Sequence, residues 1–551
     1  MKSSKICNNI VALICLVLVL SRSESMLAGK SDHVENSKAP FRCLRKCLCS
    51  GDMETILCEY SPPDIIKHFQ AKLGAAKRLS IRNSKIDQLY NDTFNNMLLM
   101  AELTITRSYM YGIAEKSLQQ FPRLTHLDLS FNKIEIVGKP VSFMDKHFNW
   151  AVAHLPNFMT SKLLRYVDLS GNSIRHISQE QLYGMKYVQH LNLSSNNILR
   201  IDSGYTLLMG LKELDLSYNR ITEVDVKFGA SQLLLEELYL SHNYIRKIPT
   251  LEYFSCAHLE RMDVSFNDLH EIMSVGISHC SNIKYLNLEN NKISLIKDSD
   301  FQFLTELEIL NVARNQIKSI QNGSFDFNSK LQELYISDNS ITHIDDFTFF
   351  GLKSATIMDL SKNRITFVAE NTFNRNVWLC YLYLHGNKVH HIAPKTFKNL
   401  PLLRIVNLSD NLLTTPYSSW FLSPSGEFYF NVTALKVEER IRTTTATFLT
   451  SGNNWMCDCS TKDFHRWALG QTNSSGQATA SPRIVCYSPS FHSGKNLLKL
   501  EAAKLSCDTM FHAKYFILYH KRYFLMSTLI ILTLVAYLRK AALAKRRFHN
   551  L

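Results

Sequence analysis

The 551-residue sequence lacks the short motifs that mark common catalytic and nucleotide-binding sites. It has no G-x-S-x-G stretch, which would expose a serine nucleophile on a sharp turn, and no glycine-rich loop that would hold a phosphate. His385, His390 and His391 lie close together in the sequence, but they have no cysteine or carboxylate partners at the spacing of a zinc site. We therefore expect no enzyme, no cofactor and no metal site.

A large net charge is also missing from most of the chain. The formal net charge is +14, but +8 of it lies in residues 514–551, which contain no acidic residue, and +2 lies in residues 1–25. The 488 residues between these segments carry only +4. A nearly neutral central region argues against a nucleic acid as the partner.

Long apolar runs are restricted to the two ends. Two lysines precede the apolar run Ile10–Leu20, and small residues follow it, which predicts a signal peptide over 1–25. Near the other end, Tyr523–Leu538 is uncharged and is followed by basic residues. We predict a transmembrane helix over 523–540 and a cytoplasmic tail over 541–551, in a single-pass type I protein of the plasma membrane. The alternative is a helix lying on the membrane surface of a secreted protein.

Eleven of the 13 cysteines remain once the signal peptide is removed, and they fall into two groups of four with three between them. Cys256 and Cys280 are 24 residues apart and occupy equivalent positions, so we expect two stacked core thiols, with a disulfide as the alternative. Cys380 has no obvious partner in the sequence. Because the number of mature cysteines is odd, Cys380 is a candidate for a disulfide to another chain.

One phrase recurs between the two cysteine groups, in forms such as "LKELDLSYNRI" and "LQELYISDNSI". Its asparagines are mostly 23 or 24 residues apart, and two earlier copies have serine in the same place, so we count 14 repeats. In L-x-L the apolar residues alternate with polar ones, which predicts a short strand with one buried face. The asparagine then turns the chain, and its amide can bond the backbone of neighbouring turns. The expected product is an α/β solenoid. The asparagines are Asn132, Asn172, Asn196, Asn219, Asn243, Asn267, Asn291, Asn315, Asn339, Asn363, Asn387 and Asn411.

Phenylalanines recur ten residues after the turn, and we expect them to stack on the convex side. They are Phe94, Phe301, Phe325, Phe349, Phe373 and Phe397. The step from Asn132 to Asn172 is 40 residues long and predicts an insertion over 138–160. It is interpreted either as a loop packed on its own repeat or as a partner-binding excursion.

These repeats and the flanking cysteines resemble the extracellular leucine-rich-repeat proteins, a group that includes Toll-type receptor ectodomains and Slit-like proteins. The resemblance implies a horseshoe with an N-terminal cap over 43–77, repeats over 78–435 and a C-terminal cap over 453–508. It also implies four disulfides, which are Cys43–Cys49, Cys47–Cys58, Cys457–Cys486 and Cys459–Cys507. In its general architecture the chain also resembles insect-type immune leucine-rich-repeat proteins.

In this family the concave face is the usual binding surface, and here its second half carries tyrosines. We expect a protein ligand at Tyr239, Tyr285, Tyr335, Tyr381 and Tyr383. The other interpretation is that these are simply good outward-facing strand residues. Glycosylation sequons stand at Asn91, Asn192, Asn322, Asn407, Asn431 and Asn473. Asn192 and Asn407 are expected to point into the concave face, which favours the middle repeats as the ligand site.

Two functions from different classes remain. The first is a cell-surface receptor or co-receptor without its own signalling domain, which binds a protein or microbial ligand and acts with a signalling co-receptor or as a homodimer. The second is an adhesion or matrix-organising protein, in which contact is itself the function.

Overall fold

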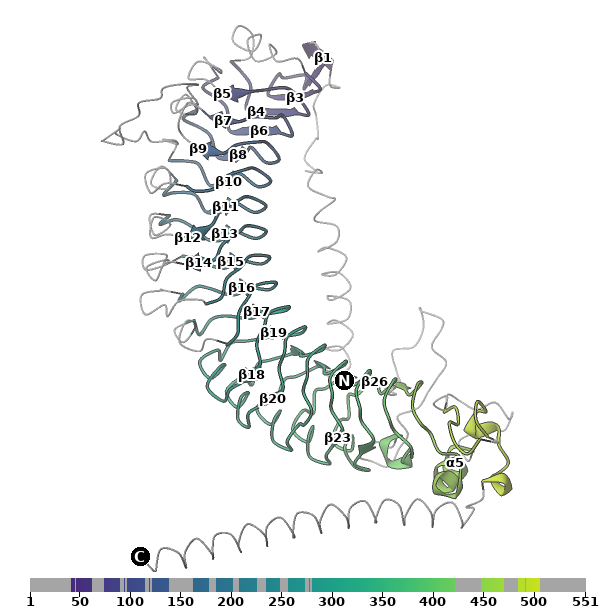
Figure 1. The fold of residues 1–551 in the computed structure, drawn as a ribbon. Helices are drawn as coiled ribbons and strands as arrows, with labels where there is room; N and C mark the ends of the chain where they lie inside the picture. Colours follow the sequence, from purple (N-terminus) through teal and green to yellow (C-terminus); the bar gives the residue numbers. More distant parts are fainter. Residues whose placement is uncertain are drawn as a thin grey trace, which may run out of the picture.

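The computed structural model describes most of residues 41–505 as a curved solenoid of repeated turns (Figure 1). The longest undescribed stretches within it are 138–161, 422–446 and 470–483. The expected signal peptide, insertion 138–160, membrane helix 523–540 and tail 541–551 lie outside the described residues. No helix within the described part of 41–505 has the length and apolar character to cross a membrane.

Every repeat expected from the sequence contributes one strand to a single parallel sheet, in which equivalent residues pair; Leu214, for example, pairs with Leu238. The middle residue of each three-residue strand is buried, and the flanking residues face outward, as the L-x-L pattern predicts. The strands are β4 (Arg78–Arg82), β6 (Glu102–Thr106), β8 (His126–Asp128), β10 (Tyr166–Asp168), β11 (His190–Asn192), β13 (Glu213–Asp215), β15 (Glu237–Tyr239), β16 (Arg261–Asp263), β17 (Tyr285–Asn287), β19 (Ile309–Asn311), β21 (Glu333–Tyr335), β22 (Ile357–Asp359), β24 (Tyr381–Tyr383) and β26 (Ile405–Asn407).

The buried asparagines hold successive turns together. The amide nitrogen of Asn267 donates to Val264 O at 3.1 Å in its own turn and to Leu240 O at 2.9 Å in the preceding turn. Its Oδ1 accepts the backbone N–H of Ile245 at 2.9 Å. One side chain thus satisfies three backbone groups that the turn would otherwise leave buried and unpaired. The same pattern repeats along the solenoid, and we call it the asparagine ladder.

The side of the solenoid opposite the sheet contains the expected phenylalanine stack. Ring centroids are 5.7 Å apart between Phe301 and Phe325, 6.3 Å between Phe325 and Phe349, and 6.0 Å between Phe349 and Phe373. Phe397 instead packs edge-on against Trp420 and Phe448, and Phe94 pairs with Phe121. Short two-residue strands follow the sheet strands along the chain and form small parallel sheets of their own: β5 (Gln88–Leu89), β7 (Gly112–Ile113), β9 (Ile136–Val137), β12 (Arg200–Ile201), β14 (Glu223–Val224), β18 (Leu295–Ile296), β20 (Ser319–Ile320), β23 (Phe367–Val368) and β25 (His391–Ile392).

Small elements cover both ends of the sheet. At the N-terminal end, β1 (Phe41–Leu44), β2 (Cys47–Cys49) and β3 (Thr55–Glu59) form an antiparallel unit, and β3 joins β4 in parallel. At the other end, β27 (Thr447–Leu449) pairs with β26, so the sheet continues past residue 435. The C-terminal unit contains the 3₁₀ helices η2 (Ser418–Phe421), η3 (Cys459–Thr461), η4 (Leu497–Lys499) and η5 (Ala502–Lys504), and α5 (Lys462–Leu469).

Disulfides occur in both end units and in the middle. Cys47 is bonded to Cys58, and Cys457 to Cys486. Cys49 and Cys459 are disulfide-bonded as well; the side chain of Cys43 and the whole of Cys507 lie outside the described part of the chain.

The expectation of two free core thiols at Cys256 and Cys280 is wrong. The two residues form a disulfide, with their Cα atoms 4.9 Å apart. Because the chain advances by one turn in 24 residues, equivalent positions stack directly and come within bonding reach.

Candidate ligand-binding faces

Two outward-facing columns of side chains cover the concave sheet, one from the first and one from the third residue of each strand. In the third-residue column, most members are Asp or Asn, and each Oδ1 accepts the backbone N–H two residues later. Asp215 accepts Ser217 N at 2.8 Å, and Asn287 accepts Glu289 N at 3.1 Å. These residues therefore shape the turn that follows the strand, and their abundance needs no ligand to explain it.

The predicted tyrosines lie on this sheet in two separate groups. Tyr239 and Tyr285 belong to β15 and β17, and Tyr335, Tyr381 and Tyr383 belong to β21 and β24. Asn287 and Asn311 stand between the groups in the third-residue column. All five tyrosines are half-buried. The five do not converge on one point, and the second group is the denser.

Glutamates on the same strands hold two of these tyrosines. The hydroxyl of Tyr335 donates to Glu333 Oε2 at 2.8 Å, and that of Tyr239 donates to Glu237 Oε2. Burial and the Glu333 carboxylate raise the pKa of the Tyr335 hydroxyl, so the ring stays neutral at physiological pH and presents its apolar face. Fixed orientations reduce the entropy lost on binding a ligand.

Tyr285 is held differently. The guanidinium of Arg261 lies 4.8 Å from its ring centroid, and Arg261 also faces Glu237 at 3.9 Å. Burial, followed by the Asp263 carboxylate, raises the pKa of Tyr285 to about 12. The charges of Arg261 and Glu237 therefore compensate each other around the first tyrosine group.

Sequence reasoning missed an aromatic stack at the edge of the sheet. The residue directly before each ladder asparagine has positive φ, and we call this row the edge column. Within it, ring centroids are 4.0 Å apart between Tyr218 and His242 and 4.1 Å between His242 and Phe266, with the ring planes within 12° of parallel. The available signal was an aromatic residue at the same place in "SYN", "SHN" and "SFN".

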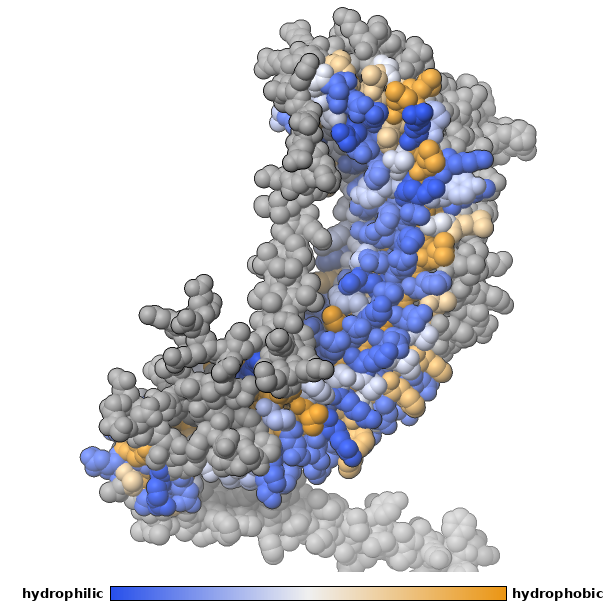
Figure 2. Space-filling view, turned by 180° about the vertical axis from the view of Figure 1, so that it is seen from behind, coloured by the Kyte–Doolittle hydropathy of each residue, from blue (hydrophilic) through white to orange (hydrophobic). Residues whose placement is uncertain are grey.

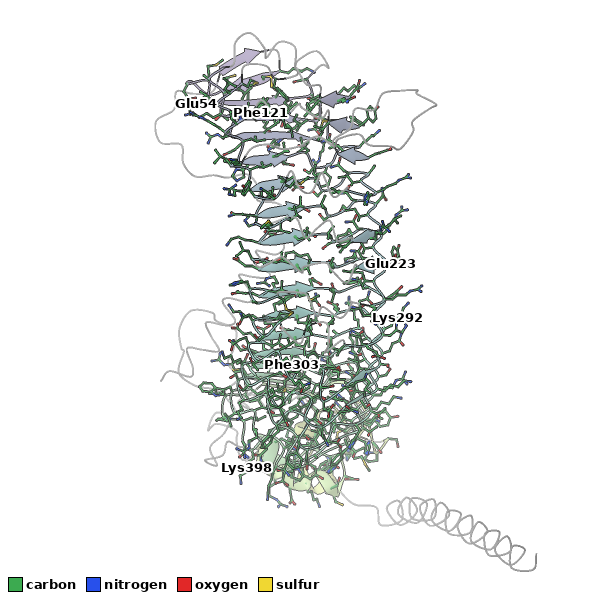
Figure 3. All side chains as sticks on the ribbon, turned by 90° about the vertical axis from the view of Figure 1, so that its left-hand side faces the viewer. Glu54, Phe121, Glu223, Lys292, Phe303 and Lys398 are labelled. Carbon is green, nitrogen blue, oxygen red and sulfur yellow. A yellow bond between two sulfur atoms is a disulfide. The ribbon has the colours of Figure 1, made fainter. Side chains whose placement is uncertain are left out.

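A second set of exposed aromatic residues lies within five positions in sequence of the stacked phenylalanines. Hydrophilic residues cover most of the described surface seen in Figure 2, and hydrophobic residues form separate patches. In Figure 3, Glu223 and Lys292 project at one side edge and Lys398 at the opposite one. The exposed aromatic residues of this set are Phe303, Phe327, Phe347, Phe350 and Trp378.

Three sequons fall on described residues. Asn192 and Asn407 occupy the third-residue column of β11 and β26, near opposite ends of the concave sheet, and Asn322 is exposed on the convex side. Asn91, Asn431 and Asn473 lie outside the described residues. Strands β13 to β24 carry no sequon in their outward columns.

Two further features concern sulfur and metal. Cys380 is fully buried directly before β24 and is disulfide-bonded within this single chain, which contradicts the predicted bond from Cys380 to another chain. Where the structure describes the chain, no group of three His, Cys, Asp or Glu side chains is arranged to hold a metal ion.

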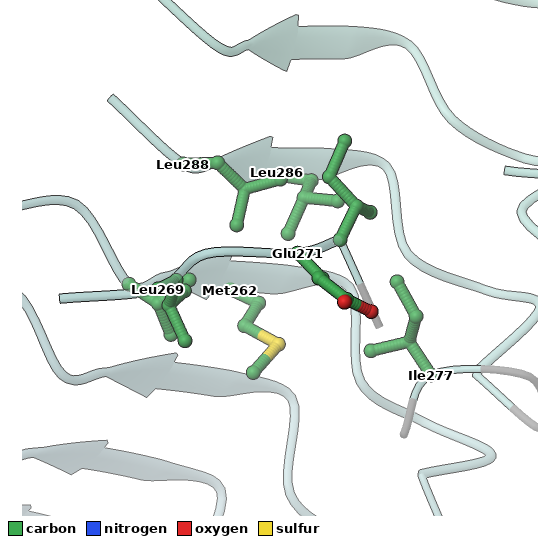
Figure 4. A pocket seen from close by; sticks show the side chains of 8 residues that line it. Met262, Leu269, Glu271, Ile277, Leu286 and Leu288 are labelled. Atoms are coloured by element: carbon green, nitrogen blue, oxygen red, sulfur yellow. The ribbon is translucent and has the colours of Figure 1, made fainter. Parts of the chain in front are cut away.

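A small apolar cavity of about 20 Å³ lies in the core where the phenylalanine stack ends (Figure 4). Its lining comes from two adjacent turns and includes Met262, Ile277, Leu286 and Leu288, with Glu271 at one side. A space of this size holds at most one water, and an apolar lining offers that water no partners. The cavity is therefore a packing defect and not a ligand site.

The family profile described as "Leucine rich repeat" matches residues 75–134 and 158–205 and, in overlapping copies, 209–424, which together exceed half of the chain. Toll-like receptor 9 of Equus caballus is 29% identical over 158 residues, 25% of this chain and 15% of that protein. Chaoptin of Drosophila melanogaster is 28% identical over 156 residues, 27% of this chain and 12% of that protein. CD180 antigen of Mus musculus is 24% identical over 233 residues, 33% of each. The chain thus spans a third or less of these relatives.

Solved structures agree on the architecture. A TLR13–ssRNA13 complex superposes with a TM-score of 0.62 at 21% identity, over 81% of this chain and 60% of the other. The glycosylated Toll–Spatzle complex, from Drosophila, gives 0.63 at 18% identity, over 79% and 58%. At these identities the likeness establishes the solenoid fold alone.

Proposed function

Because the chain belongs to the leucine-rich repeat family, we propose that it is a cell-surface recognition protein that binds an extracellular protein or microbial ligand on its concave face. The observation that carries the proposal is the second tyrosine group. Tyr335, Tyr381 and Tyr383 lie on the neighbouring strands β21 to β24, half-buried, on a sheet face that is free of sequons between β13 and β24. Rings held on a rigid sheet supply contact area at little entropic cost.

The relatives support binding of a ligand outside the cell. One solved neighbour is a complex of Toll with Spatzle, and another is a complex with single-stranded RNA. The near-neutral charge of the central region favours a protein over a nucleic acid here. The predicted membrane anchor at 523–540, the signalling co-receptor, the homodimer and the domain boundaries belong to the same proposal.

Proximity labelling tests the proposed concave-face binding with the full-length chain displayed on cells. It compares the native protein with a double variant that carries Tyr335→Ala and Tyr383→Ala. We expect the double substitution to lower recovery of the principal extracellular partner by about tenfold or more, the loss typical of interface hot spots. The matched control is Tyr187→Ala, an exposed tyrosine away from the sheet. Equal recovery from all three proteins would sink the concave-face assignment.

Adhesion is the competing function, and cell mixing separates the two. If contact is itself the function, cells that express only this protein aggregate with each other. As a recognition protein, it leaves such cells dispersed until the partner is supplied.

A further inference from the structure

The edge column is a row of equivalent side chains spaced for stacking. Its residues share one backbone conformation, with φ of 55° at Ser195, Tyr218 and His242, so their side chains leave the chain in the same direction. The backbone N–H of Tyr218 donates to Ser241 O at 2.8 Å, and that of His242 to Ser265 O at 3.0 Å, which fixes the spacing of neighbouring turns. Ring separations of 4.0 and 4.1 Å show that each position in the column has room for one planar group.

Ser195 contributes no ring to the edge column, although Phe131 precedes it and Tyr218 follows it in that column. The Phe131 ring lies over Gly171, where a Cβ would come within 2.7 Å of Phe131 Cδ1. On the other side, Tyr218 begins the stack and is 56% exposed, and Phe131 is 54% exposed. Ser195 is exposed and offers only a hydroxymethyl group. We call this place between the Phe131 and Tyr218 rings the open rung.

Charges of both signs stand in the turns around the open rung, since Arg220 is exposed two residues after Tyr218. In the same turns, the third-residue column of the sheet presents Asp128, Asp168 and Asp215, with Asn192 in the turn of Ser195 itself. The Oδ1 of Asp168 and that of Asp215 accept backbone N–H groups, and neither carboxylate forms an ion pair among the described residues. A cation at the open rung would lie on the same edge as these carboxylates.

One arginine of the edge column already packs on a neighbouring aromatic ring. In the edge column, the Arg107 guanidinium lies 5.3 Å from the centroid of the Phe131 ring. On the sheet, the Arg261 guanidinium lies 4.8 Å from the centroid of the Tyr285 ring. A guanidinium is planar and keeps its charge, so it suits a ring face such as that of Tyr218, as Arg107 does at Phe131 and Arg261 at Tyr285.

We propose that the open rung is a subsite for one arginine side chain of a protein ligand, whose guanidinium stacks on Tyr218 above Ser195. This extends the proposed function and rests on it, but it concerns the edge of the sheet and not the concave tyrosines. The two ideas can therefore fail separately.

Ligand-observed saturation-transfer NMR tests the subsite on the full-length chain in detergent micelles. The probes are the heptapeptide Gly-Ser-Gly-Arg-Gly-Ser-Gly and versions with Lys, Phe or Ala at the centre. We expect saturation of the Arg peptide to exceed that of the Ala peptide by about fivefold, the equivalent of about 1 kcal/mol of cation–π attraction. A Phe peptide that equals or exceeds the Arg peptide would overturn the choice of arginine.

Substitutions then locate the site. Ser195→Trp fills the open rung from within, in a backbone conformation that aromatic residues already adopt at positions 131 and 218. It should reduce the Arg-peptide signal to that of the Ala peptide. Tyr218→Ala should do the same, whereas Tyr218→Phe keeps the ring and the signal. Asn290→Ala, directly beyond the far end of the stack, is the matched control for Tyr218→Ala and leaves the signal unchanged.

Two more measures keep the outcome decisive. All variants are made with Ser194→Ala, which removes the sequon at Asn192 and retains its amide, so that a glycan cannot cover the open rung. A single-stranded oligonucleotide is tested in parallel. Saturation of the oligonucleotide that Ser195→Trp abolishes, without saturation of the Arg peptide, would overturn the protein ligand. An Arg-peptide signal that survives Ser195→Trp would overturn the site.

Discussion

Ile277 occupies, in its turn, the position that Phe301 occupies 24 residues later. Phe301 is the first of four stacked rings, and the smaller Ile277 lines the cavity of about 20 Å³ directly before it. The defect thus arises because the aromatic stack begins one turn too late to fill this part of the core.

Ile277→Phe should extend the stack and fill the cavity. Burying the additional ring atoms is expected to raise the free energy of unfolding by about 0.5–1 kcal/mol, measured by urea unfolding. Ile277→Ala, which enlarges the same space, should lower it by about 2–4 kcal/mol. A loss of stability in the Phe variant would mean that the neighbouring turns cannot accommodate the ring.

Asp300 is a buried carboxyl at the position where later turns have Ser324 and Thr348. Burial raises its pKa to about 6, against a usual value of 3.8, and its Oδ2 accepts the backbone N–H of Lys297 at 2.7 Å. Between about pH 4 and pH 6 the unfolded chain loses this proton while the folded chain retains it. Asp300 therefore costs no stability in acid and destabilises the fold as pH rises through that window.

Asp300→Asn keeps an acceptor for Lys297 and removes the charge. We expect the free energy of unfolding to rise by about 1–2 kcal/mol at pH 7 and to change little at pH 4. Asp298→Asn, an exposed neighbour, serves as the control and should show no such pH-dependent gain. An equal gain from Asp300→Asn at both pH values would exclude titration of this carboxyl as the cause.

The Cys256–Cys280 disulfide closes a 24-residue segment and should contribute about 3 kcal/mol through the entropy of the unfolded chain. Replacing both cysteines with alanine is expected to lower stability by this amount. Non-reducing proteolysis and mass spectrometry should yield one linked peptide from the native chain, which separates on reduction. Two free, alkylatable thiols in the native protein would contradict the bond.

Asn267→Ala removes the acceptor of Ile245 N–H and the donor to Leu240 O and Val264 O, so we expect a loss of about 2–4 kcal/mol. Asn267→Ser should cost less. At Ser108, a serine in the same position donates to Thr106 O at 2.9 Å and accepts Ser84 N at 3.3 Å. Equal losses for Ala and Ser, measured by urea unfolding, would show that the ladder depends on the second donor of the amide.

The sequence predicted what depends on local spacing. Strand positions, the asparagine turns and the stack from Phe301 to Phe373 all follow from a 24-residue period and the alternation in L-x-L. The Tyr335–Glu333 hydrogen bond could also have been predicted from the sequence, because residues two apart on a strand share a face.

What the sequence did not show depends on how adjacent turns are oriented. The spacing of Cys256 and Cys280 placed them in neighbouring turns, but not with their sulfur atoms facing each other. The Tyr218–His242 stack requires positive φ at both residues, which a pattern of residue types does not reveal. For the same reason the open rung at Ser195 becomes apparent only in three dimensions.

The asparagine ladder also separates what this solenoid must keep from what it can change. Ile134 N–H bonds Asn172 at 3.0 Å across a 38-residue gap in sequence, and Leu413 N–H bonds Asn453 at 3.0 Å across 40 residues, with the same geometry as in ordinary turns. The strands on either side of each long repeat still pair in parallel, β8 with β10 and β26 with β27. An insertion of some 16 residues or more can therefore be carried by a repeat while the ladder bond and the strand pairing across it stay as they are elsewhere.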